Sequence, residues 1–193
     1  YSVTKALNRQ STGLGGAIIG SPIFLQEAEK TLNDYHISIG AIMHPLSAYL
    51  THLNRTTLKR DMLLFSENAL RVARALDAHP NVKKVHYPFL PESNHFALAC
   101  RQMTGGGGLL SFELESFEAA RKLVESLKTA RLAPHLGDEN ENLIIHPAST
   151  THSKLSPEEL KKVRIPPELV RLSVSLGEMD ELIFDLGKVL RTL

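Results

Sequence analysis

The sequence predicts an α/β fold built in two parts. Apolar residues recur at spacings of three and four over residues 57–79, which is typical of a long amphipathic helix. On both sides of that stretch, short apolar runs bounded by glycine or proline alternate with further helical patterns. Apolar residues make up 42% of the 193 residues, so a hydrophobic core can form. We expect a first part over residues 1–56 and a second part, the long helix and a small α/β domain, over residues 57–193.

The first part is expected to contain two strands followed by two helices. A strand and a glycine-rich turn lead into the apolar run at 15–20, which reads as a buried strand because turn residues bound it. Pro22 stands where a helix can start, and apolar residues follow it at helical spacing. A loop is expected at 36–38, and Pro45 is expected to open the second helix.

The second part is expected to be a small domain in which strands and helices alternate. The long helix should end before Pro80, because proline cannot continue a helix. Ser156 and Glu159 have the spacing of a capping box at the start of a helix. The expected strands lie at 82–87, 109–114, 142–146 and 169–176, and the expected helices at 117–127, 157–163 and 180–193.

Charge and cysteine content restrict the class of protein. The net charge of +1 gives no reason to expect a nucleic acid or a membrane surface as partner. No apolar stretch is long enough to cross a bilayer. Cys100 is the only cysteine, so we expect no internal disulfide and a cytoplasmic location, with Cys100 buried in a helical stretch. His146 and His152 lack further ligand candidates, so no metal site is expected.

Ser2, Thr4 and Lys5 form the candidate cofactor site. Pyridoxal phosphate needs an amine that bonds to its aldehyde and hydroxyl or N–H groups beside its phosphate. A lysine that follows two hydroxyl residues can supply both from one short segment. Because Ser-x-Thr-Lys is short, its spacing alone favours a solvated lysine at the end of a strand, in a structural α/β module where the lysine is incidental.

Several further segments, in order along the chain, carry a resemblance to a known family. The most specific is the run Ile-His-Pro-Ala-Ser-Thr-Thr-His at 145–152. The others are residues 2–5 with the glycine-rich stretch after them, 68–69, 80–88, 106–112, 136–138, 170–174 and 180–186. Over almost its whole length the chain resembles the cysteine and methionine metabolism family of pyridoxal-phosphate enzymes. This family includes cystathionine synthases and lyases, methionine γ-lyase and O-acetylhomoserine sulfhydrylase.

The resemblance implies a fold and a set of site residues. Residues 1–56 would be the end of the large cofactor domain of an aspartate aminotransferase-like, fold type I enzyme, and the small domain would have a mainly antiparallel sheet with helices on one face. Lys5 would bind the cofactor and act as the catalytic residue, with Ser2 and Thr4 at its phosphate. Arg171 would bind the substrate carboxylate, and His135 would be a further substrate contact. Relatives are usually tetramers built from close dimers, so a homo-oligomer is implied.

The resemblance leaves the reaction open. It implies replacement at the γ carbon of O-acetylhomoserine or trans-sulfuration, with a γ- or β-eliminating lyase as the alternative. The chain departs from the family at residues 9–12 and 175–177, and it has Asp61 and His135 where relatives have other residues. Relatives also have a front half that carries ring-binding groups, so we expect the 193 residues to be the C-terminal part of a longer enzyme. A non-catalytic relative that serves in assembly remains a further alternative.

Overall fold

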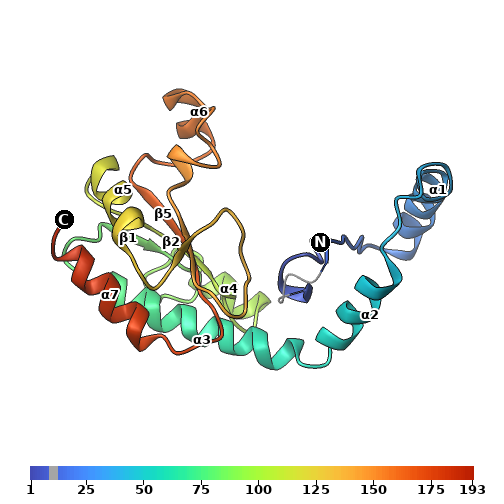
Figure 1. Cartoon of the computed structure of the whole chain (residues 1–193), viewed down its shortest axis with the longest axis horizontal. Helices are drawn as coiled ribbons and strands as arrows, with labels where there is room; N and C mark the ends of the chain where they lie inside the picture. The colour runs from blue at the N-terminus through green and yellow to red at the C-terminus, as the bar shows by residue number, and fades with distance from the viewer. Residues whose placement is uncertain (9–12) are drawn as a thin grey trace. The chain divides into compact units, whose positions relative to one another are not determined.

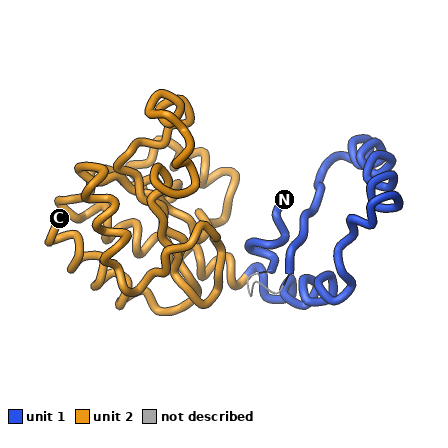
Figure 2. The backbone as a smooth tube through the Cα atoms, turned by 45° about the horizontal axis from the view of Figure 1, so that its top comes forward, with its two compact units in different colours: residues 1–59 blue, residues 60–193 orange. Residues whose placement is uncertain are grey.

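The computed structural model describes residues 1–8 and 13–193, so the departure at residues 9–12 lies outside the described part. The chain divides into two compact units, unit 1 at residues 1–59 and unit 2 at residues 60–193 (Figure 2). The sequence analysis placed this division after residue 56. Each unit is described here by itself.

Unit 1 contains a 3-10 helix, η1 (Ala6–Asn8), and two α-helices, α1 (Pro22–Ile39) and α2 (Pro45–Asn54). Helix α1 begins where predicted, because the Ser21 hydroxyl accepts a hydrogen bond from the main-chain nitrogen of Phe24. The loop expected at 36–38 is wrong. No glycine or proline interrupts the helix there, and α1 continues to Gly40, whose φ of 68° ends it in the left-handed region.

The strand expected at 15–20 is also wrong. The only bridge that the described residues form here joins Ser2 to Gly16 in antiparallel fashion. Ile18 and Ile19 are exposed, Ile19 by 81%. An apolar run becomes a strand only when a neighbouring strand satisfies its main-chain groups, and unit 1 supplies such a partner at a single position.

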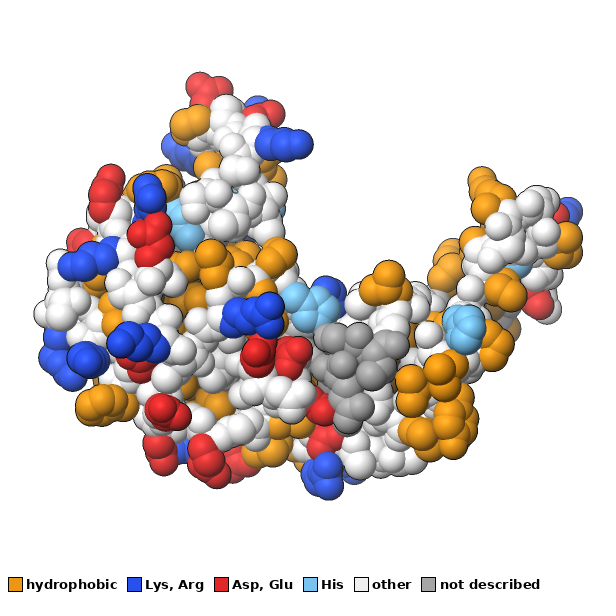
Figure 3. All heavy atoms as spheres, viewed as in Figure 1, with side chains coloured by type: hydrophobic (Ala, Val, Ile, Leu, Met, Phe, Trp, Pro, Cys, Tyr) orange, Lys and Arg blue, Asp and Glu red, His pale blue; other side chains and the backbone are white. Residues whose placement is uncertain are grey.

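The helices of unit 1 present apolar side chains to solvent. Neither α1 nor α2 has a buried residue. Figure 3 shows several of the apolar side chains on the visible face. The exposed large apolar residues of the two helices are Ile23, Phe24, Leu25, Tyr35, Ile37, Ile39, Leu46, Tyr49 and Leu53. Large apolar side chains left exposed in this number are typical of a surface that contacts other protein.

Unit 2 is built on one five-stranded sheet with the order β1-β2-β5-β4-β3 (Figure 1). The strands are β1 (Lys84–His86), β2 (Leu109–Glu113), β3 (Arg131–Leu132), β4 (Leu143–Ile145) and β5 (Leu169–Ser173). Three of the pairings are antiparallel and only β3 with β4 is parallel. The prediction of a mainly antiparallel sheet is therefore confirmed. The short strand β3 was not predicted.

Helices cover one face of this sheet and form the core. They are α3 (Leu58–Asp77), α5 (Phe117–Ser126) and α7 (Asp180–Leu190), with the shorter α4 (Phe96–Gln102) and α6 (Pro157–Lys162) elsewhere. The predicted capping box at the start of α6 is present. Cys100 on α4 is exposed, so the expectation that it is buried is wrong; the core contact of α4 is made by Ala99. Among the described residues, no helix is long and apolar enough to span a membrane.

The alternation of side chains along β5 places the candidate site on the other face of the sheet. Val170 and Leu172 point into the helix-covered core, where both are fully buried. Arg171 and Ser173 therefore point to the opposite face, which we call the outer face. In the register of the sheet, Arg171 lies between Ser111 of β2 and Ile145 of β4.

Candidate functional site

The predicted cofactor residues lie in a tight turn of unit 1. The main-chain nitrogen of Lys5 donates to the Ser2 oxygen at 3.3 Å, and η1 follows at once. The Thr4 hydroxyl accepts from the Gly15 nitrogen at 3.0 Å and donates to the Gly15 oxygen at 3.3 Å. Ser2 is exposed, whereas Thr4 and Lys5 are half-buried. The turn thus gathers two hydroxyls and an amine within four residues.

This turn fits the groups that pyridoxal phosphate requires. Lys5 offers the amine for the aldehyde, and the exposed Ser2 offers a hydroxyl for the phosphate. The Thr4 hydroxyl already bonds to the main chain of Gly15, so Thr4 would have to share or exchange that bond to donate to a phosphate. Thr4 therefore also fixes the turn on which Ser2 and Lys5 stand.

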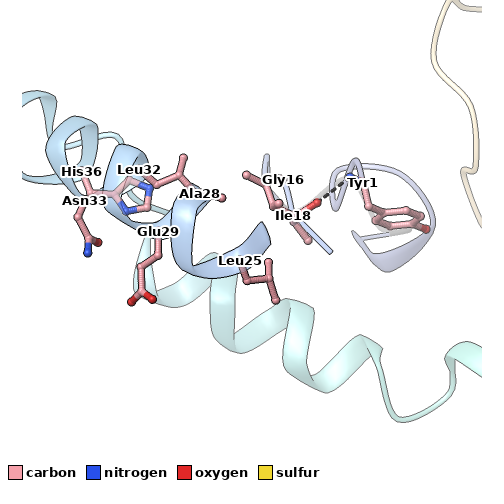
Figure 4. Close-up of a pocket in the computed structure, with 10 residues that line it drawn as sticks. Tyr1, Gly16, Ile18, Leu25, Ala28, Glu29, Leu32, Asn33 and His36 are labelled. Carbon is pink, nitrogen blue, oxygen red and sulfur yellow. Dashed lines mark hydrogen bonds between the residues drawn. The ribbon is translucent and has the colours of Figure 1, made fainter. Parts of the chain in front are cut away.

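Unit 1 also has a cavity of about 740 Å³ that the sequence analysis did not anticipate (Figure 4). It lies between the segment Gly16–Ile18 and α1, with Leu25 and Leu32 on the helix side. The amino group of Tyr1 donates to the Ala17 oxygen at its edge, at 2.6 Å. None of the predicted cofactor residues lines it. Apolar side chains of α1 line it together with the polar Glu29, Asn33 and His36.

Arg171 is a half-buried charged group on the outer face of unit 2, where the register of the sheet also places Glu113 and Lys84. Its Nη2 donates to the Pro134 oxygen at 2.9 Å and to the His135 oxygen at 3.3 Å. Burial lowers the pKa of the Arg171 guanidinium below its ordinary value. In the described part of the chain, no carboxylate forms an ion pair with Arg171. A half-buried positive charge with only neutral partners can accept an anion from outside the chain.

His135 contributes to this arrangement through its main chain. Its oxygen, together with that of Pro134, holds the guanidinium of Arg171. The side chain of His135 is half-buried, and its predicted contact with substrate remains a prediction. The sequence analysis did not foresee a role for the carbonyl groups of Pro134 and His135, because a residue that acts through its carbonyl group leaves no mark in its side-chain type.

Two cavities lie along the outer face near Arg171. One, of about 240 Å³, is lined by Arg171 together with His86, Ser111 and His152. The other, of about 290 Å³, is apolar and includes Pro134 and Ile145 in its walls. Thr151 lines both cavities. The run at 145–152, recognised in the sequence for its resemblance, is thus the segment that borders the space beside Arg171.

The histidines beside this region have structural partners. His146 is buried, and its ring nitrogens lie 2.8 Å from the Ser149 hydroxyl and 2.5 Å from the Pro167 oxygen. On β1, His86 Nε2 lies 2.6 Å from the Glu113 carboxylate on β2. Within residues 1–8 and 13–193, no cluster of three potential metal ligands occurs.

Comparisons with known proteins agree over nearly the whole chain. The family model described as "Cys/Met metabolism PLP-dependent enzyme" matches residues 1–191. L-methionine gamma-lyase of Porphyromonas gingivalis is 38% identical over 187 residues, which are 96% of this chain and 46% of that protein. O-succinylhomoserine sulfhydrylase of Mycobacterium tuberculosis is 32% identical over 195 residues, which are 98% of this chain and 47% of that protein.

A solved structure gives the same result for the fold. It is that of a Campylobacter jejuni protein assigned as an O-acetylhomoserine (thiol)-lyase, with N'-pyridoxyl-lysine-5'-monophosphate in its chain. That structure matches with a TM-score of 0.86 and 32% identity, over 98% of this chain and 52% of that one. The chain spans about half the length of the curated relatives that it matches.

Proposed function

Because the chain belongs to the family of Cys/Met metabolism PLP-dependent enzymes, we propose that the intact protein transforms a sulfur amino acid or its O-acyl precursor with pyridoxal phosphate. The proposed reaction is replacement at the γ carbon of O-acetylhomoserine, or the related trans-sulfuration. The sulfhydrylase relative and the run at 145–152 support this choice. Elimination from methionine or cystathionine is the second candidate, supported by the 38% identity to L-methionine gamma-lyase.

The roles of the chain's own residues follow from their chemistry. Lys5 would hold the cofactor through its aldehyde, and Ser2 and Thr4 would bind its phosphate. When bound, the cofactor withdraws electrons from the α carbon of the substrate. The amine of Lys5 would also serve as the base that takes a proton from one substrate carbon and returns it to another. Arg171 would hold the substrate carboxylate through its planar donor fork.

One observation carries this proposal: the half-buried guanidinium of Arg171 bonds to two main-chain oxygens and, among the described residues, to no carboxylate. A buried ion pair would have neutralised this charge. Carbonyl oxygens orient the group but leave its positive charge uncompensated. A bidentate substrate carboxylate supplies the missing charge and fits the planar donor fork of arginine.

The cofactor assignment is tested by chemical trapping in the intact protein. Borohydride reduction should fix a pyridoxyl group on the peptide that contains Lys5, detected by mass spectrometry. Lys5→Ala should abolish both the label and the visible absorbance of the bound cofactor. Lys30→Ala, which changes an exposed lysine on α1, should leave both unchanged. A label on another lysine would contradict the assignment.

The choice of reaction is tested with matched substrates. O-Acetylhomoserine and sulfide should yield homocysteine and acetate if the enzyme performs replacement. Methionine should yield methanethiol, 2-oxobutyrate and ammonia if it performs elimination. A protein that binds the cofactor at Lys5 yet releases none of these products would support the third possibility, a non-catalytic relative.

We also propose that unit 1 is the end of a larger cofactor domain and that the protein is a cytoplasmic homo-oligomer. The exposed apolar residues of α1 and α2 support both proposals, because the rest of that domain or a second copy of the protein would cover them. Light scattering coupled to size exclusion would give the mass of the assembly. A monomeric protein at all concentrations would exclude the oligomer.

A further inference from the structure

The loop between β3 and β4 is tied to β5 at three successive levels. Arg171 Nη2 donates to the oxygens of Pro134 and His135. Two residues further along β5, the Ser173 hydroxyl accepts from the Gly137 nitrogen at 3.0 Å. Beyond the end of β5, the Leu176 nitrogen donates to the Glu139 oxygen at 3.0 Å. The loop therefore lies alongside β5 and the residues after it, and hydrogen bonds join the two segments at three places.

Ser173 is the buried member of this series. It lies two residues after Arg171, so both side chains point to the outer face. Ser173 is nevertheless only 3% exposed, which indicates that the loop covers it. A buried hydroxyl that accepts a main-chain N–H satisfies two groups at once, and its loss would leave the Gly137 N–H without this acceptor.

Gly137 has the conformation that the bond requires. Its φ is 76°, in the left-handed region that glycine enters without steric cost. A side chain at this position would clash with its own main chain and would push the loop away from this geometry. Ser173 and Gly137 together thus determine where the loop turns.

We propose that Ser173 is a positioning residue for Arg171 and sets the affinity for the substrate carboxylate. The Pro134 and His135 carbonyls orient the guanidinium, and they lie only three and two residues before Gly137. When the Ser173 hydroxyl holds Gly137, it holds these carbonyls and, through them, the donor fork. This inference rests on the proposed role of Arg171 in carboxylate binding.

Ser173→Ala in the intact holoenzyme should raise KM for the amino-acid substrate about 5- to 20-fold. This is the change expected when the loss of one buried hydrogen bond leaves Arg171 less well oriented. It should leave kcat within about twofold, because Lys5 is untouched. Amide hydrogen exchange in the peptide 133–141 should become faster. The affinity for glycine, a carboxylate ligand with no leaving group, should fall by the same factor as KM rises.

Ser175→Ala is the matched control. Ser175 is equally buried, but its hydroxyl accepts from the Gly177 nitrogen at 3.3 Å and not from residues 134–137. This variant should lower the melting temperature about as much as Ser173→Ala and leave KM unchanged. If Ser173→Ala does not fold, Gly137→Ala breaks the same bond from the other side and should raise KM similarly. The double variant should be no worse than the stronger single one.

The results separate this inference from the proposed function. If Arg171→Lys raises KM while Ser173→Ala leaves it within twofold, the positioning role is wrong and the carboxylate role stands. If Ser175→Ala raises KM as much as Ser173→Ala, the effect is general destabilisation and the positioning role is wrong. If Arg171→Lys itself leaves KM unchanged, the carboxylate role fails and the positioning role fails with it.

Discussion

The carboxylate of Asp185 on α7 accepts two hydrogen bonds from Thr129, one from the main-chain nitrogen at 3.1 Å and one from the hydroxyl at 3.0 Å. It also accepts from the Lys128 nitrogen at 2.8 Å. One half-buried side chain therefore fixes the turn between α5 and β3 against the last helix.

Asp185→Ala should lower the free energy of unfolding by about 1–2 kcal/mol, because three donors lose a charged acceptor at a partly solvated site. Burial alone would raise the pKa of the Asp185 carboxyl, yet the bonds from Lys128 and Thr129 lower it overall. Urea unfolding measures the difference. Glu125→Ala, which removes an exposed pair with Arg121, should change the free energy of unfolding much less than Asp185→Ala does.

The same carboxylate predicts a pH dependence. A group whose pKa is lowered by folding stabilises the fold above its unfolded pKa, and this contribution is lost as pH falls through the folded pKa. The stability difference between the parent chain and Asp185→Ala should therefore be constant near neutral pH and shrink below about pH 4. A difference that stays constant down to pH 2 would contradict this account.

Tyr87→Phe should destabilise unit 2 by about 1–2 kcal/mol. The Tyr87 hydroxyl lies 3.0 Å from the Ser66 oxygen and 2.9 Å from the Gly107 oxygen. Its single proton is donated to one of these carbonyls at a time, which joins α3 to the glycine turn before β2. Burial raises the pKa of Tyr87 to about 12, with a smaller opposing effect from a main-chain bond at Gly106. The stabilising contribution should thus be complete below pH 10 and be lost as pH rises through 12.

Gly106→Ala tests the same contact by adding volume. A Cβ at residue 106 would lie 2.5 Å from Cζ of Tyr87, so the ring must move. We expect a loss of about 1–3 kcal/mol in unfolding free energy. Combining it with Tyr87→Phe should cost less than the sum of the two single changes, measured in the same urea series.

Asn68→Asp should be more damaging than Asn68→Ala. Asn68 on α3 is buried, and its Nδ2 donates to the oxygens of Ser175 and Gly177, both at 3.0 Å. Alanine removes the two bonds, whereas aspartate places a negative charge against two carbonyl oxygens. We expect losses of about 2 kcal/mol for alanine and about 3 kcal/mol or more for aspartate, seen as lower melting temperatures. Equal losses would contradict the electrostatic part of this argument.

Arg171→Lys should raise KM for the amino-acid substrate about 10- to 100-fold, because an ammonium cannot reproduce the bidentate fork. The melting temperature should change little, since no ion pair is lost within the described residues. Arg131→Ala is the matched control. Arg131 lies on β3 of the same sheet, and this change removes its exposed ion pair with Glu141. Steady-state kinetics of both variants gives the two KM values. A rise in KM for Arg171→Lys alone indicates a specific role of Arg171, and a similar rise for both variants indicates a general effect of lost positive charge.

The sequence by itself was enough to predict the family and most helices and strands of unit 2. Helix α3, strands β2 and β5 and the capping box of α6 were predicted because their periodicity and caps are local properties. The family prediction is confirmed. It was possible from the sequence because the motifs of a family occur in a fixed order along the chain. The roles of Ser2, Thr4, Lys5, His135 and Arg171 remain predictions.

Tertiary structure decided what the local pattern could not. The apolar run at 15–20 resembles a strand, but a strand needs a partner for its main-chain groups, and that partner is a long-range feature. Cys100 is exposed because its position on α4, not its residue type, determines burial. The contacts of Arg171 with the Pro134 and His135 carbonyls, and the bond from Gly137 to Ser173, join segments more than thirty residues apart. Main-chain acceptors carry no side-chain signature, so only the fold of unit 2 reveals them.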